Sequence, residues 1–189
     1  MTGDDVDDAV TEMVRVLGPH VTADWTVGAG TLDWSCWTTA AHVADDLLAY
    51  ASQVAGGATT AYLPFDLNVH ADTPPADVLQ VVAACGSLLS GAIAVAAPDA
   101  RAWHFGPSDT GGFAAMGVGE TLLHTYDIAA GLGIPWRPSA RLSAGVLRRL
   151  VPDAPQGDPV DVLLWRTGRA DLDGHPPPGP WGWHAAVGS

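Results

Sequence analysis

The segment from residue 113 to 132 constrains the fold most strongly, because nearly every side chain in it is apolar or small. Three polar groups interrupt it: Glu120, His124 and Asp127. A helix that is apolar almost all round is usually buried, and buried acids and imidazoles need partners or a metal ion. The segment therefore predicts a central helix that buries one short polar stripe.

Three further segments have the apolar spacing of long helices. Residues 4–17 carry acids in the first turn, where the helix dipole favours them. Residues 36–55 end at a pair of glycines, and residues 76–97 follow a pair of prolines, which suit a helix start. With the segment 113–132, these helices predict an all-α four-helix bundle.

The other segments are shorter or irregular. They are a connection at 58–73, a loop at 101–112, an amphipathic helix at 139–150, an apolar segment of open type at 159–166, and a tail at 174–187. The tail is rich in proline and glycine, and its two tryptophans predict that it lies on the body. We expect a bundle over residues 1–137 and a short C-terminal extension over 138–189.

Charge and cysteine content limit the partners and the compartment. The net charge of −13, from 21 acids and 8 arginines, repels phosphate backbones and anionic lipid surfaces. Cys36 and Cys85 are too few for a disulfide framework, and we interpret both as buried thiols. The acidic N-terminus is unlike a secretory signal, and we expect no apolar stretch to approach the roughly 20 residues of a membrane span. These features predict a cytoplasmic monomer or homodimer with no nucleic-acid or membrane partner.

The polar stripe carries the chemistry. Glu120 and His124 are four residues apart and share one helical face, with Asp127 three residues further along it. A metal site in a bundle also needs a ligand from a facing helix, and His42 is the only histidine inside another predicted bundle helix. A solvated acidic face is the alternative interpretation, and helical spacing alone places His42 on the surface as readily as in a cleft.

Two stretches together resemble a known family: LDWSCWTTAAHVADDLLAYA and GFAAMGVGETLLHTYDIAAGLG. They are similar to the actinobacterial maleylpyruvate isomerase N-terminal domain family of the DinB-like superfamily, as is LLWRTGR near the end. The resemblance implies an up-down four-helix bundle. It also implies one divalent metal ion, often zinc, held by His42, Glu120 and His124, with nickel or iron using similar donors.

The resemblance further implies thiol chemistry. Members of the family activate a low-molecular-weight thiol such as mycothiol for isomerisation or S-transfer, so we expect a thiol-using transferase or isomerase acting on a small electrophile. Only about 50 residues follow the bundle, fewer than a typical separate domain, which departs from the isomerase pattern. A metal-dependent hydrolase and a non-catalytic metal-binding bundle remain the alternatives.

Several residues are assigned secondary roles. We expect Asp127 to accept a hydrogen bond from a ligand histidine rather than to bind the metal. Trp34, Trp37 and His104 are weak candidates for the substrate pocket. Cys36 has no basic neighbour that would lower its pKa, so an attacking thiol should come from outside the chain. Three arginines could meet an anionic group or form surface pairs: Arg101, Arg166 and Arg169.

Overall fold

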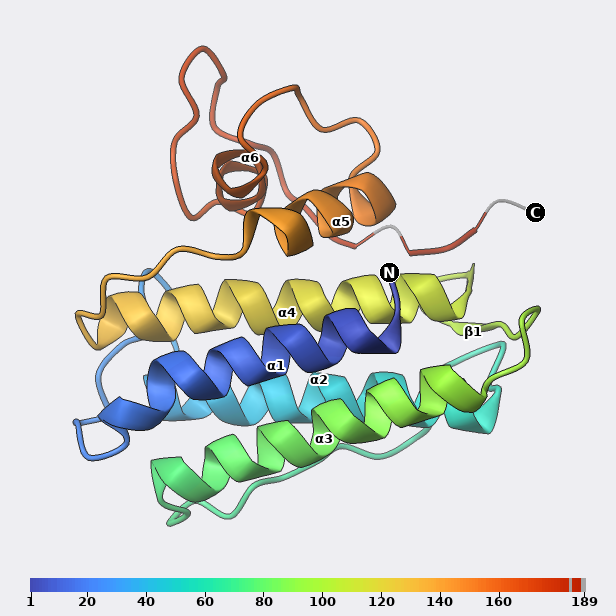
Figure 1. The fold of residues 1–189 in the computed structure, drawn as a ribbon, viewed down its shortest axis with the longest axis horizontal. Coiled ribbons are helices and arrows are strands. Elements are labelled where there is room, and N and C mark those ends of the chain that lie inside the picture. Colours follow the sequence, from blue (N-terminus) through green and yellow to red (C-terminus); the bar gives the residue numbers. More distant parts are fainter. Residues whose placement is uncertain (184, 188–189) are drawn as a thin grey trace.

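A computed structural model describes residues 1–183 and 185–187 and confirms the all-α four-helix bundle (Figure 1). The four long helices are α1 (Gly3–Leu17), α2 (Cys36–Gly56), α3 (Pro75–Val95) and α4 (Thr110–Gly131). Helix α4 begins three residues earlier than expected, because the side chain of Asp109 caps it by accepting a hydrogen bond from the Gly112 amide. His184, to which the sequence assigned no function, lies outside the described residues.

The direction of α3 departs from a simple up-down order, because α2 and α3 run in the same direction (Figure 1). The connection at 58–73 is long and irregular, as predicted, and it runs back along α2. Leu67 donates its amide to the Asp45 carboxylate at 2.6 Å, and Trp37 donates its indole N–H to the Thr73 carbonyl at 2.8 Å. The start of α3 therefore lies beside the start of α2.

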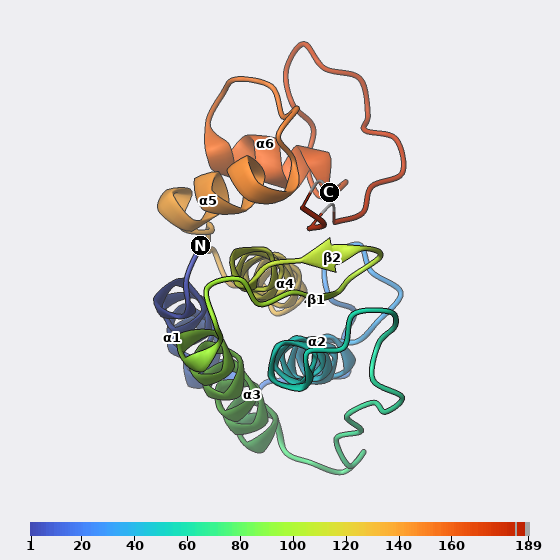
Figure 2. The same ribbon diagram turned by 90° about the vertical axis from the view of Figure 1, so that its right-hand side faces the viewer.

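Helix α4 lies between the other three helices of the bundle and the C-terminal extension (Figure 2). Every residue from Gly112 to Ala129 is buried except Tyr126. On one side α4 packs against α1 and α2, and on the other side it packs against α5 (Ala140–Leu150). This confirms the prediction of a central, buried helix.

The extension contains α5 and α6 (Pro159–Arg166). The apolar segment at 159–166, whose secondary structure the sequence left undecided, is therefore helical. A hairpin of β1 (Ala102–Trp103) and β2 (Pro107–Ser108) lies in the loop before α4, and a single 3-10 turn, η1 (Gly18–His20), follows α1. The tail lies against the body, where the Ser108 hydroxyl donates to the Ala185 carbonyl at 2.8 Å.

Helix α3 corrects one expectation. It is long and apolar enough, by length and composition, to cross a membrane, with a mean hydropathy of 2.0 over 18 residues. The expectation that no stretch would approach this length and composition was wrong. In the mean hydropathy of α3, the few polar residues, such as Gln80 and Ser87, are outweighed by alanine, valine and leucine. In the structure α3 packs against α1 and α2, and 33% of that window is buried.

The connection between α1 and α2 packs tightly on the end of α4. An isolated bridge joins Gly28 to Ser35 and closes this connection into a loop. A Cβ atom at Gly131 would collide with the Gly28 carbonyl oxygen and lie 2.8 Å from the Cys36 sulfur. Glycine at position 131 therefore lets the loop that carries Trp34 approach α4.

Gly131→Ala should destabilise the protein by about 1–3 kcal/mol, because the added methyl group meets backbone that cannot move without shifting the loop. Gly91→Ala is the matched control, since it is a helical glycine of α3 with open space around it, and it should stabilise by up to about 1 kcal/mol. Urea unfolding measures both changes. A Gly131→Ala protein as stable as the wild type would contradict this account of the loop.

Candidate metal centre

Three side chains from two antiparallel helices meet near the middle of the bundle. His42 comes from α2, and Glu120 and His124 come from α4. Each offers one donor atom, and the three donor atoms lie within 4.8 Å of one another. The His42 and His124 rings have centroids 5.2 Å apart, so His42 faces α4, a direction that helical spacing alone left open. The cluster could hold a divalent metal ion.

Asp127 and Arg169 fix the outer side of the His124 ring. The Nδ1 atom of His124 lies 3.1 Å from Oδ2 of Asp127, which leaves Nε2 directed toward Glu120 at 3.2 Å. Asp127 also accepts three hydrogen bonds from the guanidinium of Arg169: Nε to Oδ1 at 2.9 Å, Nε to Oδ2 at 3.2 Å, and Nη2 to Oδ2 at 2.6 Å. Such a paired arrangement restrains the carboxylate strongly, and through it the imidazole.

A tryptophan of the tail fixes Glu120 from the opposite side. The indole N–H of Trp183 donates to Oε1 of Glu120, while Oε2 faces His124. The ring of Trp183 lies so close to α4 that a Cβ atom at Gly119 would be 3.0 Å from it. The C-terminal extension therefore supplies a contact to each α4 member of the cluster, Trp183 to Glu120 directly and Arg169 to His124 through Asp127.

The ionisation of these groups follows from their neighbours. Burial alone would lower the pKa of His124, but the hydrogen bonds with Asp127 and Glu120 outweigh it and raise the pKa to about 9. The pKa of Glu120 is lowered, since its contacts with His124 and Trp183 outweigh an opposing effect of burial. Burial and the nearby His124 lower the pKa of His42. Without an ion, His124 holds a proton between two carboxylates.

Two members of the cluster, His42 and Glu120, line a cavity of about 440 Å³. The cavity wall includes His42, Glu120 and Asp46, the last of which lies one helical turn after His42 at 3.2 Å from its ring nitrogen. Burial and the neighbouring Glu120 raise the pKa of Asp46 to about 8. The rest of the wall is mainly aromatic and contains Tyr50, Tyr62, His104, Phe105, Trp181 and Trp183.

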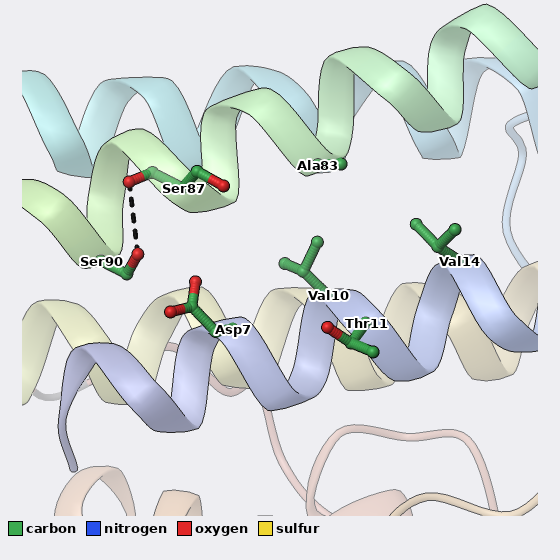
Figure 3. A pocket seen from close by; sticks show the side chains of 7 residues that line it. All are labelled: Asp7, Val10, Thr11, Val14, Ala83, Ser87 and Ser90. Carbon is green, nitrogen blue, oxygen red and sulfur yellow. Dashed lines mark hydrogen bonds between the residues drawn. The ribbon is translucent and has the colours of Figure 1, made fainter.

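A second hollow, of about 450 Å³, lies between α1 and α3 (Figure 3). Its lining contains Val10 and Val14 of α1 and the hydroxyl groups of Ser87 and Ser90 of α3. Among the described residues that line it, Asp7 is the one charged residue and none is a histidine or a cysteine. Since it lacks a set of converging donors, we locate the chemistry in the cavity beside α4.

The structure brings two of the three predicted pocket residues to the site. Trp34 stacks edge-on against His42 with ring centroids 4.7 Å apart, and His104 lines the cavity. Trp37 lies elsewhere, because it precedes His42 by five residues, which turns it about 140° around the helix. Its indole instead donates to the Thr73 carbonyl.

Sequence reasoning missed Asp46 and Tyr62, and it did not predict which side chains Arg169 and Trp183 would contact. Asp46 could have been found from its spacing of four residues from His42, the same spacing that linked Glu120 to His124. No pattern indicated Tyr62, which lies in an irregular connection, or the partners supplied by Arg169 and Trp183. Arg169 was considered for an anionic group or a surface pair, but its side chain is buried against Asp127.

Comparison with known proteins identifies the family. No curated protein and no solved structure matches the chain. Residues 6–129 match the family described as the mycothiol maleylpyruvate isomerase N-terminal domain. The match covers about two thirds of the chain and includes all three residues of the candidate metal cluster, whereas Arg169 and Trp183 lie beyond it. The chain therefore belongs to the mycothiol maleylpyruvate isomerase N-terminal domain family.

Proposed function

We propose that this protein is a divalent-metal-dependent enzyme that uses a mycothiol-like thiol as a transferase or isomerase of a small electrophile. The convergence of His42, Glu120 and His124 beside a cavity that the first two of them line supports this proposal most directly. Membership in a family described by a mycothiol-dependent isomerase supports the choice of thiol chemistry. We further propose a cytoplasmic location and no nucleic-acid or membrane partner.

The donor set fits a divalent ion. Two imidazoles and one carboxylate are typical ligands of zinc in sites that keep a position open, and nickel or iron would use similar donors. Because Asp127 lies against Nδ1 of His124, the nitrogen left for a ligand is Nε2. An ion held there would lower the pKa of an incoming thiol, so that a thiolate forms at neutral pH.

The side chains around the cluster would orient the reactants. Trp34 is 42% exposed and covers His42 from the outside, where it can shield the site and contact a ligand. The aromatic wall suits a small, partly apolar molecule.

Elemental analysis of protein purified without chelator tests the metal site. We expect close to one divalent ion per chain, with zinc favoured. His42→Ala, Glu120→Ala and His124→Ala should each abolish tight binding, while His70→Ala, an exposed histidine outside the cluster, should leave the metal content unchanged. Sub-stoichiometric metal under replete conditions would contradict the mechanism, and full binding by His42→Ala would show that the third ligand lies elsewhere.

Asp127→Asn should lower the metal affinity by about tenfold to a hundredfold without abolishing it, because the amide holds the His124 ring less firmly and loses its charge pair with Arg169. A competition titration with a coloured chelator measures the affinity. Asp77→Asn, on the exposed face of α3, is the control and should bind as the wild type does. Complete loss of metal would make Asp127 a ligand, and unchanged affinity would remove it from the site.

The double variant Cys36→Ala, Cys85→Ser should keep most of its thiol-dependent turnover and its metal. Both thiols are buried, and burial raises the pKa of each to about 11, so neither forms a thiolate at neutral pH. Consumption of added thiol with a panel of electrophiles measures turnover. If turnover vanishes while folding and metal content persist, a covalent intermediate on the chain replaces the external thiol.

A further inference from the structure

Tyr62 and His104 form a hydrogen-bonded pair in the wall of the cavity. Tyr62 comes from the connection between α2 and α3, and His104 follows β1. The Tyr62 hydroxyl bonds to Nδ1 of His104. Trp103 donates its amide to the Ala58 carbonyl at 2.7 Å, which ties the hairpin to the connection. Two segments distant in sequence thus deliver one polar pair to the cavity that also contains His42 and Glu120.

The hairpin holds the His104 ring in place at a conformational cost. The His104 amide donates to the Gly106 carbonyl at 2.8 Å, and Tyr50 and Phe105 pack edge-on against the imidazole with centroids 6.1 and 5.2 Å away. Phe105 has a φ of 53°, in the left-handed region that a phenylalanine rarely adopts, and its side chain is 80% exposed. Such strain persists where the surrounding structure enforces it and is concentrated at functional sites.

The bond to Tyr62 selects the tautomer of His104. Burial raises the pKa of Tyr62 to about 12 and lowers the pKa of His104, so at neutral pH the phenol keeps its proton and the imidazole is uncharged. In such a pair the more acidic phenol donates and Nδ1 accepts, which leaves the ring proton on Nε2.

The Nε2 atom has no hydrogen-bond partner among the described residues. Fully buried side-chain nitrogen or oxygen atoms without a partner are rare in the part of the chain that the structure describes. The hydroxyl of Ser143 is the one such atom there, so Nε2 of His104 is not fully enclosed, although His104 as a whole is only 8% exposed. Because His104 lines the cavity, this nitrogen is within reach of a molecule bound there.

We propose that Nε2–H of His104 donates a hydrogen bond to a carbonyl oxygen of the molecule bound in the cavity, with Tyr62 as the positioning residue that fixes the donor tautomer. The inference deepens the proposed function and rests on it, because it assigns the electrophile to the class of carbonyl compounds.

The tautomer is tested by long-range ¹H–¹⁵N NMR of the imidazole rings in the purified full chain. We expect His104 to carry its proton on Nε2 in the wild type, and Tyr62→Phe to populate both tautomers. A wild-type ring protonated on Nδ1, or a tautomer unchanged in Tyr62→Phe, would overturn the assignment. The measurement needs neither turnover nor an identified substrate.

Binding is tested with cyclohexanone and methylenecyclohexane, which have similar shapes but differ in the carbonyl oxygen. His104→Leu should weaken cyclohexanone binding by about threefold to tenfold, the contribution of one hydrogen bond. His104→Gln, whose amide N–H can replace Nε2–H, should restore most of it. Binding of methylenecyclohexane should be the same in all three proteins. An equal loss of affinity for both probes would overturn the proposal, since it would indicate a change in cavity shape alone. Unchanged binding of cyclohexanone by His104→Leu would also overturn it.

These readouts separate the two proposals: a protein without thiol-dependent turnover that still shows the tautomer and the probe selectivity would refute the proposed reaction but keep the donor assignment.

Discussion

The burial of a polar stripe within an otherwise apolar helix is the constraint on which the rest of the structure depends. Glu120, His124 and Asp127 are all at least nine-tenths buried in α4. An ionised group without a partner in such surroundings costs several kcal/mol, so each must be compensated. Glu120 and His124 contact each other, Trp183 bonds to Glu120, and Arg169 pairs with Asp127. The C-terminal extension therefore compensates the buried polar groups of α4 and also covers the helix.

The candidate site is formed by two kinds of segment, regular helices and irregular connections. The three donors of the metal cluster come from α2 and α4, where regular backbone holds side chains most precisely. The aromatic and hydrogen-bonding wall of the cavity comes from the connection after α2, the β1–β2 hairpin and the tail. The return of the 58–73 connection along α2 makes this possible, because it carries Tyr62 to the hairpin that presents His104. Variation in the connections could therefore alter the ligand while the metal cluster stays the same.

Much of the fold was predictable because it depends on local patterns. The apolar spacing and the glycine and proline signals located four helices to within three residues at each end. The parallel direction of α2 and α3 was not predictable, since it depends on the course of a connection that has no period. Trp37 was placed in the pocket from proximity in sequence, yet the helical turn directs it away. The mean hydropathy of α3 was underestimated because much of it comes from small residues such as alanine.

The sequence by itself determined the chemistry available on each helix: a Glu and a His one turn apart on α4, an Asp beyond them, and a histidine on α2 that family resemblance matched to them. A spacing of three or four residues fixes which side chains share a helical face, and that relation survives folding. Only the tertiary structure decided that His42 faces α4, that Arg169 and Trp183 hold Asp127 and Glu120, and that Tyr62 meets His104. Each of these contacts joins residues at least 42 positions apart, and the contact of His42 also depends on how α2 is rotated against α4. Such contacts follow from packing that no local pattern encodes.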